Sequence, residues 1–280
     1  MGVLDGRSVV VTGAGRGLGR AYAMDAAREG ASVVVNDIDP STAESVVEEI
    51  VLQGGRAIAS SASVADWDGA DTLIRACTDE FGRIDGLVNN AGVITIGAPW
   101  DISEAEARGM VEVNVLGSIF VGTHAMRAMR SSGGGSIVNT TSSAQFGFPG
   151  LSVYSATKGA LASLTYTWAL DLASEGIRVN AFSPVADTAM SWLSDVPKGV
   201  LPAPEDNAPV VTYLLSDLAA DVTGQVVQRR PPNTLAVVAH PSITEHTGQV
   251  AEWTAEGVQR GFATVLRDHA QEVGWGVGRS

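Results

Sequence analysis

The 280-residue sequence predicts a doubly wound α/β fold, in which helices cover both faces of a parallel sheet. Short runs of β-branched residues alternate with longer helical patterns from the N-terminus onward. The runs are almost continuously apolar, which is typical of strands that are buried on both faces. A glycine-rich stretch separates the first run from the first helical pattern, where folds of this class often bind a ligand.

The predicted elements follow one another with short connections. Strands are expected at 8–13, 31–37, 86–92, 135–142 and 177–184. Helices are expected at 18–30, 105–130 and 153–174. The glycine-rich segment 131–136 predicts a turn and not a linker, because a buried strand follows at once.

The character of the sequence changes after Arg229, where Pro, Thr and His become frequent. We expect residues 1–230 to form a single domain. Residues 231–280 are few and only modestly apolar for a core of their own. They predict a C-terminal extension that packs on the domain or on a neighbouring subunit.

Composition excludes several classes of function. The chain carries 18 Lys and Arg against 31 Asp and Glu, a formal net charge of -13, which argues against binding to nucleic acid or to an anionic membrane. The single cysteine, Cys77, cannot form an internal disulfide, and the scattered His240, His246 and His269 do not predict a metal site. Neither a signal peptide nor a membrane span is evident, so a cytoplasmic protein is expected.

The glycine-rich stretch predicts a dinucleotide site. Gly13, Gly17 and Gly19 permit a tight turn and a close approach to a pyrophosphate at the start of a helix. Asp37 lies 18 residues beyond Gly19, where a carboxylate can accept hydrogen bonds from the adenosine ribose and repel the extra phosphate of NADP. We therefore expect NAD, with NADP less favoured, although Arg16 in the turn could pair with that phosphate.

Two alternatives remain for this acidic segment. Asp37 could instead be a helix N-cap or a turn residue, and Asp39 is a neighbouring candidate for the ribose contact.

Tyr154 and Lys158 lie four residues apart in VYSATKGAL, and so share one face of a helix. In isolation the pair is better explained as a rim tyrosine beside a solvated lysine than as a functional pair. The motifs that precede it decide between the two interpretations.

With TGAGRGLG at 12–19, NNAG at 89–92 and YSATK at 154–158 in this order, the chain resembles the short-chain dehydrogenase/reductase family. The resemblance covers about residues 5–228. It implies a Rossmann-type domain, a nicotinamide cofactor, and hydride transfer between a secondary alcohol and a ketone. It also implies a catalytic tetrad and a homodimer or homotetramer formed through the two long helices.

The tetrad of the family falls on Asn114, Ser142, Tyr154 and Lys158. The usual spacing back from the tyrosine would select Thr141, and Ser143 is adjacent, but strand register favours Ser142. The pKa of a free phenol is near 10, so Tyr154 needs a neighbouring positive charge to act as a base. Lys158 can supply that charge and would also bind the nicotinamide ribose. Ser142 would orient the substrate oxygen, and Asn114 would support a water-linked proton relay.

The resemblance extends to the cofactor contacts. It implies contacts from Gly13, Arg16, Gly17, Leu18, Gly19, Asp37, Val64, Asn90, Gly92, Tyr154, Lys158, Pro184 and Thr188. Two positions depart from the family pattern. Ser63 replaces an aspartate near the adenine, which leaves Val64 as the expected backbone contact. Val185 replaces a glycine, so the loop after Pro184 is expected to take another path.

The expected substrate loop, at about 188–205, is short and suggests a site open on one side. With the Val185 departure and the tail, it resembles the 3-hydroxyacyl-CoA dehydrogenase branch of the family, so we expect a small-molecule substrate that is a 3-hydroxyacyl-CoA or another bulky hydrophobic alcohol. The alternatives are a hydroxysteroid or other hydrophobic-alcohol dehydrogenase, and a catalytically silent cofactor-binding regulator. Residues that could line an apolar pocket, or only pack the loops, are Met190, Trp192, Leu193, Trp100, Phe146 and Phe148.

Overall fold

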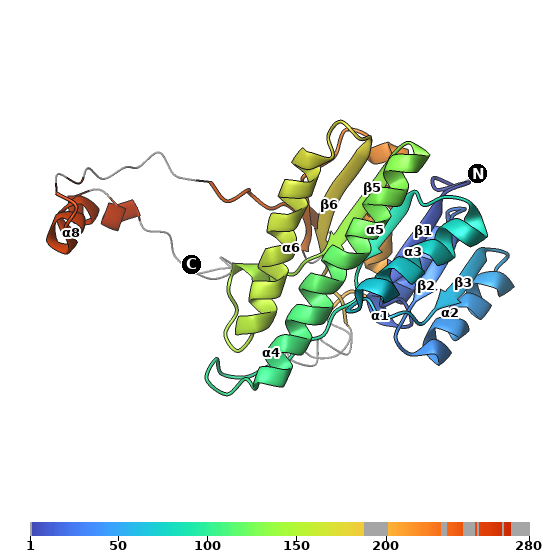
Figure 1. Cartoon of the computed structure of the whole chain (residues 1–280), viewed down its shortest axis with the longest axis horizontal. Helices are drawn as coiled ribbons and strands as arrows, with labels where there is room; N and C mark the ends of the chain where they lie inside the picture. The colour runs from blue at the N-terminus through green and yellow to red at the C-terminus, as the bar shows by residue number, and fades with distance from the viewer. Residues whose placement is uncertain are drawn as a thin grey trace. The chain divides into compact units, whose positions relative to one another are not determined.

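A parallel sheet forms the centre of the first of two compact units, Met1–Val238 and Ala239–Ser280. The computed structural model describes residues 2–187, 201–230, 234–242, 250, 252–264 and 266–269. Figure 1 shows the chain coloured from its N-terminus to its C-terminus. The fold is of the Rossmann type, as the sequence predicts.

The sheet contains eight strands within the described residues, in the order β3-β2-β1-β4-β5-β6-β7-β8. Their bounds are Ser8–Thr12 (β1), Ser32–Asn36 (β2), Arg56–Ser60 (β3), Gly86–Asn89 (β4), Gly135–Thr140 (β5), Ile177–Ser183 (β6), Val226–Arg230 (β7) and Thr234–Val237 (β8). Neighbouring strands are parallel except for the last pair, in which β8 is antiparallel to β7. The strand order reverses direction between β1 and β4, which places a crevice at their carboxyl ends.

Three strands lack a prediction from the sequence. β3 is a half-exposed edge strand, and β7 ends in polar residues, so neither forms a continuous apolar run. β8 pairs with β7 in an antiparallel manner. The domain boundary that the sequence predicts at residue 230 therefore falls between two paired strands. The first unit continues to Val238 for this reason.

Helices cover both faces of the sheet. Their bounds in the first unit are Gly17–Arg28 (α1), Pro40–Leu52 (α2), Trp67–Phe81 (α3), Glu104–Val111 (α4), Gly117–Ser132 (α5), Ser152–Asp171 (α6) and Ala208–Leu215 (α7). The short turns are the π-helical η1 (Glu112–Leu116) and the 3-10 segments η2 (Ser143–Phe146), η4 (Pro204–Asn207) and η5 (Asp217–Ala219). The second unit contains α8 (Ala255–Thr264) and η6 (Leu266–His269).

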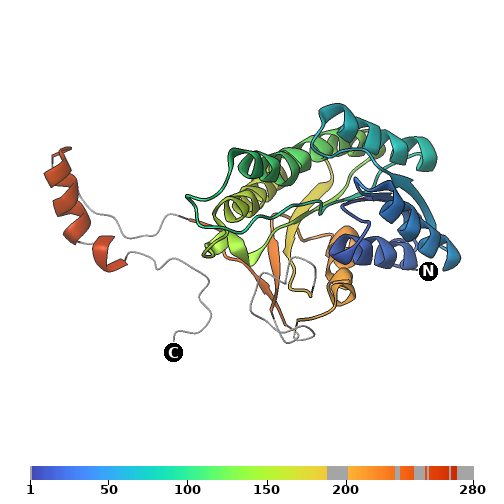
Figure 2. The same cartoon turned by 90° about the horizontal axis from the view of Figure 1, so that it is seen from below.

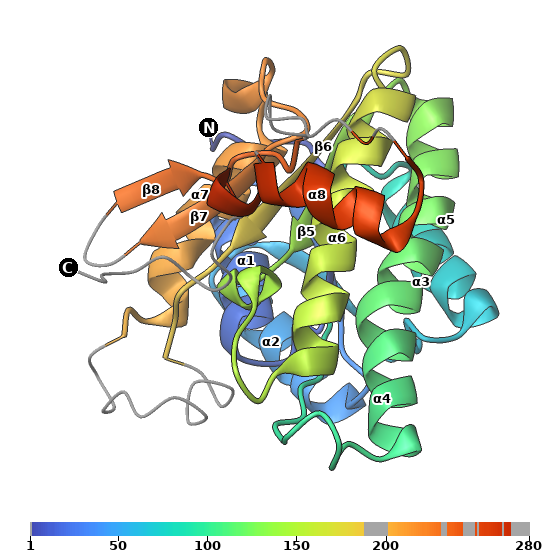
Figure 3. The same ribbon diagram turned by 90° about the vertical axis from the view of Figure 1, so that its left-hand side faces the viewer.

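Alternate residues of each strand face opposite layers, which divides the core in two. Val9 and Val11 pack with residues of α1, α2 and α7, whereas Val10 packs with residues of α3, α5 and α6. Figures 1 and 3 show α3, α5 and α6 side by side on one face, and Figure 2 shows the sheet between this layer and the layer that contains α1. The helix expected at 105–130 is interrupted by the π turn η1, so it forms α4, η1 and α5 in succession.

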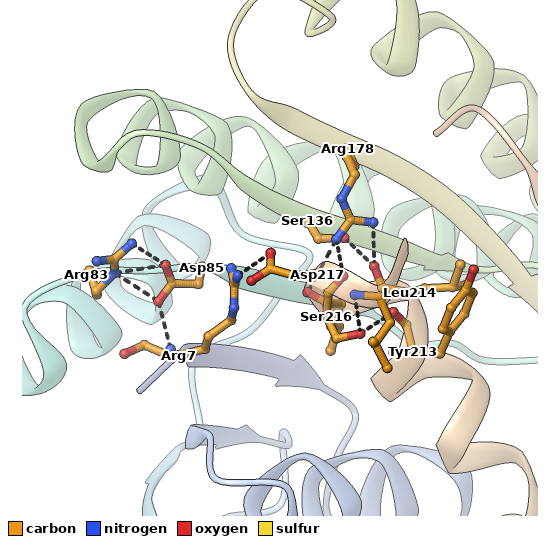
Figure 4. Close-up of polar contacts among 12 residues, drawn as sticks. Arg7, Arg83, Asp85, Ser136, Arg178, Tyr213, Leu214, Ser216 and Asp217 are labelled. Atoms are coloured by element: carbon orange, nitrogen blue, oxygen red, sulfur yellow. Dashed lines mark hydrogen bonds and ion pairs between the residues drawn. The ribbon is translucent and has the colours of Figure 1, made fainter. Parts of the chain in front are cut away.

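A polar network closes the end of the sheet at which the parallel strands begin (Figure 4). The Arg178 guanidinium donates hydrogen bonds to the carbonyl oxygens of Leu214 (2.8 Å) and Ser216 (2.9 Å) at the end of α7. Burial lowers the pKa of Arg178, and the nearby Arg7 adds to the effect. Asp85 is buried and accepts a hydrogen bond from the Ser8 amide at 2.9 Å. The network therefore fixes the amino ends of the strands and leaves their carboxyl ends for a site.

Candidate active site

The glycine-rich turn after β1 has the geometry of an anion-binding loop. Gly13 and Gly17 have φ angles of +62° and +54°, which only glycine adopts easily. A β carbon on Gly19 would lie 2.1 Å from the carbonyl oxygen of Gly13 and 2.5 Å from Asn90 Nδ2. The N-cap residue of α1, Arg16, makes no side-chain cap hydrogen bond, and the first turn of α1 contains no acidic residue. The backbone N–H groups of this first turn therefore have no side-chain cap, and such groups are suited to bind an anion.

Asn90 joins the end of β4 to this turn. Its Nδ2 donates hydrogen bonds to the carbonyl oxygens of Thr12 (2.9 Å) and Gly13 (3.1 Å). Leu18 is half-buried and packs against the core beneath the turn. The predicted cofactor residues of β1, α1 and β4 thus lie together at the carboxyl edge of the sheet.

Asp37 faces the same turn from the end of β2. Its Oδ2 accepts a hydrogen bond from the Gly15 amide at 3.0 Å, and its Oδ1 accepts one from the Asp39 amide at 3.2 Å. The N-cap of α2 is Asp39, whose side chain accepts a hydrogen bond from the Ser41 amide. The alternative in which Asp37 caps the helix is therefore wrong.

Val64, the expected adenine contact, lies beside the first residue of α5. A β carbon on Gly117 would lie 2.9 Å from Val64 Cγ2, so the glycine permits this close packing. Val64 follows β3 and is half-buried.

Asn114 lies in the π turn and is completely buried. Its Oδ1 accepts a hydrogen bond from the Val93 amide at 2.8 Å, and its Nδ2 donates to the Val93 carbonyl oxygen at 2.9 Å. The second Nδ2 hydrogen bond, at 3.1 Å, goes to Thr157 Oγ1 on α6. Both donor bonds of Nδ2 and one acceptor bond of Oδ1 are thus made within the protein, and they connect η1 to α6 and to the segment after β4.

Ser142 is the hydroxyl residue that reaches Tyr154. Its side chain forms a hydrogen bond with Tyr154 that lowers the tyrosine pKa, whereas burial of the phenol has the larger, opposite effect and raises it. Ser142 Oγ also accepts a hydrogen bond from the Ala144 amide at 3.2 Å. Thr141, the alternative from family spacing, is buried, and its Oγ1 has no hydrogen-bond partner among the described residues. Ser143 begins the 3-10 turn η2.

Lys158 is buried beneath Tyr154 on the same face of α6. Its Nζ lies 5.6 Å from the centroid of the Tyr154 ring and donates a hydrogen bond to the Thr140 carbonyl oxygen at 2.7 Å. Burial lowers the pKa of Lys158 to about 8. Gly92 completes this group, because a β carbon there would lie 3.7 Å from Lys158 Nζ and 3.3 Å from Asn114 Oδ1.

The segment after β6 accommodates Val185 without strain. No non-glycine residue in the described part of the chain has a positive φ. The Val185 amide donates to Asn207 Oδ1 at 3.3 Å, and its carbonyl oxygen accepts from Asn207 Nδ2 at 3.0 Å. Pro184 is half-buried directly after β6. Thr188, Met190, Trp192, Leu193 and most of the expected loop at 188–205 lie outside the described residues.

Two apolar segments lie beside the group around Tyr154. Val93 and Ile96, after β4, are each 42% exposed, and Phe148, before α6, is 47% exposed. The two segments are joined by a hydrogen bond of 3.0 Å from the Gly97 amide to the Gly150 carbonyl oxygen. Trp100 is more exposed still, whereas Phe146 is half-buried. We refer to the exposed apolar side chains of Val93, Ile96 and Phe148 as the apolar rim.

Other parts of the described chain show no competing site. No group of three or more His, Cys, Asp and Glu side chains suited to a metal ion occurs in the ranges that the structure describes. His124 is buried with its Nδ1 3.1 Å from Asp71 Oδ1, which gives it a structural role between α3 and α5. Burial raises the pKa of Cys77 to about 12, so its thiol is inert. No described helix has the length and apolar character to cross a membrane.

Comparison with known proteins agrees with this geometry. The family model described as short chain dehydrogenase matches residues 7–195. The chain belongs to the short-chain dehydrogenase/reductase family. It is an oxidoreductase that acts on CH–OH or carbonyl groups and uses a nicotinamide cofactor.

Several relatives show how the resemblance is distributed along the chain. A short-chain type dehydrogenase/reductase of Mycobacterium tuberculosis is 41% identical to this chain, and the match covers 81% of this chain and 85% of the relative. A 3-oxoacyl-[acyl-carrier-protein] reductase of Synechocystis is 38% identical and covers 80% and 96%.

Among solved structures, a short chain dehydrogenase from Mycobacterium avium has a TM-score of 0.85 and 37% identity, and covers 95% of this chain and 96% of its own. A 7α-hydroxysteroid dehydrogenase in complex with NADH and 7-oxo glycochenodeoxycholic acid has a TM-score of 0.77 and 31% identity, and covers 82% and 95%. The M. avium structure matches a larger share of this chain than the steroid dehydrogenase does.

Proposed function

We propose that this family member interconverts a secondary alcohol and a ketone, with Tyr154 as the general acid and base and with NAD as its cofactor. The observation that carries the proposal is that Ser142 and Lys158 both lie beside Tyr154, while Asn114 bonds to Thr157 on the same helix. Ser142 follows β5, Tyr154 and Lys158 lie on α6, and Asn114 lies in η1. Lys158 bonds to Thr140 at the carboxyl end of β5, the edge at which ligands of such sheets bind.

Proton transfer is the task of the tyrosine. In the oxidation direction the Tyr154 phenolate takes the hydroxyl proton of the substrate, and in the reduction direction the phenol returns it. Burial opposes the phenolate, so its formation depends on the Ser142 hydrogen bond and on the Lys158 ammonium. The lysine keeps its place through the Thr140 carbonyl oxygen, which leaves its other two hydrogens available to ligands.

The residues of the crevice fit a nicotinamide dinucleotide, which supplies the hydride acceptor or donor when bound. Backbone N–H groups from Gly17 to Gly19 would hold its pyrophosphate. Val64, Asn90 and Gly92 would contact the cofactor between this turn and the tetrad, and Pro184 with Thr188 would hold the carboxamide end. The support for this fit is the set of glycine positions at which a side chain would fill the cradle.

NAD is proposed over NADP because of Asp37. Its carboxylate is already held in place by the Gly15 and Asp39 amides, so it presents fixed negative charge beside the ribose position. A phosphate at the same place would be repelled.

For the substrate we propose a 3-hydroxyacyl-CoA-like thioester or another bulky hydrophobic alcohol. The apolar rim of Val93, Ile96 and Phe148 supports a large apolar body, and the Synechocystis relative is named as a 3-oxoacyl-[acyl-carrier-protein] reductase. A hydroxysteroid or other free hydrophobic alcohol is the second candidate, favoured by the steroid dehydrogenase among the solved structures. Turnover of free alcohols against turnover of thioesters alone separates the two.

We also propose a homodimer or homotetramer built through α5 and α6. Leu170 on α6 is 80% exposed in the single chain, although it is a large apolar side chain. The extension after residue 230 would pack on the domain or on a neighbouring subunit.

The proposal is tested by the absorbance of reduced nicotinamide with a panel of 3-hydroxyacyl-CoAs, hydroxysteroids and simple secondary alcohols. Tyr154→Phe should abolish turnover but retain dinucleotide binding, since it removes only the hydroxyl. Tyr213→Phe is the matched control, because Tyr213 lies on α7, and this variant should keep full activity. A wild-type protein that binds the dinucleotide but is silent on the whole panel would favour the catalytically silent regulator.

A further inference from the structure

Thr157 occupies a buried position between two members of the proposed tetrad. Its Oγ1 accepts a hydrogen bond from Asn114 Nδ2 at 3.1 Å and donates one to the Tyr154 carbonyl oxygen at 2.7 Å. The side chain is 2% exposed, so water does not replace either partner. A hydroxyl has a single hydrogen to donate, and this geometry directs it toward Tyr154.

The Asn114 amide depends on this hydroxyl. Its Oδ1 and one Nδ2 hydrogen are used by the Val93 backbone, and the remaining Nδ2 hydrogen goes to Thr157. Asn114 lies in the π turn η1, where the regular hydrogen-bond pattern of the helix is interrupted. Its contact to Thr157 is therefore the direct side-chain link between η1 and the first turns of α6.

We propose that Thr157 is a positioning residue. It keeps Asn114 and Tyr154 in fixed positions relative to each other for proton transfer. The proposal rests on the proposed function, because it assigns a task only if Tyr154 transfers a proton. Without the hydroxyl, Asn114 keeps its Val93 contacts but loses its link to α6. The turn that bears Tyr154 loses a hydrogen bond at the same time. Both changes loosen the proton path without removing any group that touches the substrate.

The chain contains a matched control two turns further along α6. Thr165 Oγ1 accepts a hydrogen bond from Asn139 Nδ2 at 2.9 Å and donates one to the Leu161 carbonyl oxygen at 2.8 Å. Thr165 is also completely buried. The two threonines thus have the same partners in kind, a buried asparagine amide and a carbonyl oxygen of their own helix. Thr157 bonds directly to two tetrad residues. Thr165 bonds to none of them and reaches Asn114 only through a chain of hydrogen bonds that runs by way of Asn139, Asn89 and Ser118.

The experiment compares Thr157→Val with Thr165→Val, since valine keeps the branched shape and removes the hydroxyl. Thr157→Val should lower kcat by about tenfold, the factor that corresponds to the loss of one well-formed hydrogen bond, and should change KM for the substrate by less than about twofold. Its solvent deuterium isotope effect on kcat should increase, because proton transfer becomes slower relative to hydride transfer. Thr157→Ser should restore both quantities.

Thr165→Val should reduce thermal stability to a similar extent as Thr157→Val and should leave kcat and the solvent isotope effect at the wild-type values. Equal kinetic effects of the two valine variants, or a lower kcat for Thr157→Val with an unchanged solvent isotope effect, would overturn the proposal. If the wild type shows no turnover, or if Tyr154→Phe retains it, the proposed function itself fails. Those outcomes are distinguishable from a failure that concerns Thr157 alone.

Discussion

Substitution of Gly19 by alanine tests the anion-binding turn through its tightest contact. The added β carbon would lie 2.1 Å from the Gly13 carbonyl oxygen and 2.5 Å from Asn90 Nδ2. Ordinary contacts begin near 3.4 Å, so the turn and the start of α1 must separate by more than about 1 Å. Overpacking of this kind costs about 1–3 kcal/mol in the free energy of unfolding, and the backbone contact places Gly19→Ala at the upper end.

The functional loss should exceed the loss of stability. Displacement of the turn redirects the backbone N–H groups that would hold a pyrophosphate. We expect the Kd for NAD to rise by about tenfold or more, as follows from the loss of one or two charge-assisted hydrogen bonds. Fluorescence titration measures the Kd, and urea unfolding measures the stability.

Gly109→Ala is the matched control for this substitution. Gly109 lies within α4, where a β carbon would meet nothing within 4 Å. Alanine there should stabilise the helix by about 0.5–1 kcal/mol and leave the Kd unchanged. If Gly19→Ala binds NAD as tightly as the wild type does, this turn does not hold the cofactor.

Three further predictions concern charge and protonation. Asp37→Ser should raise the kcat/KM ratio of NADP to NAD by about tenfold or more, because the repulsion between the carboxylate and a phosphate disappears; an unchanged ratio would remove Asp37 from cofactor selection. Ser142→Ala should move the rising limb of the pH profile for oxidation to higher pH, because the hydrogen bond that lowers the Tyr154 pKa is lost; a limb that stays in place would exclude that role for Ser142. Lys158, whose pKa falls from 10.5 to about 8 on burial, binds its proton less tightly in the folded state, so the free energy of unfolding should increase between about pH 8 and pH 10.5. Over this pH range the free energy of unfolding of the wild type should increase by about 3 kcal/mol more than that of Lys158→Met. Denaturant unfolding at several pH values measures both, and parallel pH profiles for the two proteins would contradict the prediction.

Patterns local to the sequence predict the fold well because buried parallel strands are apolar throughout. β1, β2, β4, β5 and β6 all arise from such runs. β3 is half-exposed and β7 is partly polar, so their pairing depends on neighbouring strands and not on their own pattern. The interruption of the long helix at η1 is equally invisible in a hydrophobic pattern.

In the candidate site, too, some contacts follow from local sequence and others depend on tertiary packing. Tyr154 and Lys158 share a helix face, and their proximity follows from their spacing alone. The link from Asn114 to Thr157, and the contact of Val185 with Asn207, join residues that are 43 and 22 positions apart. Only tertiary packing brings such partners together. The choice of Ser142 over Thr141 depends on the path of the chain after β5, which the structure describes and the spacing to Tyr154 does not.

Hydride transfer in a single turnover, measured with and without the Tyr154 hydroxyl, tests the role of Tyr154 most directly. A secondary alcohol from the productive class, deuterated at the carbinol carbon, is mixed with enzyme and NAD, and the nicotinamide is analysed by mass spectrometry. We expect deuterium on the nicotinamide with the wild type and with Tyr213→Phe, and none above background with Tyr154→Phe, although all three bind NAD. Transfer of deuterium by Tyr154→Phe at the wild-type rate would contradict the assignment of Tyr154 as the group that moves the proton.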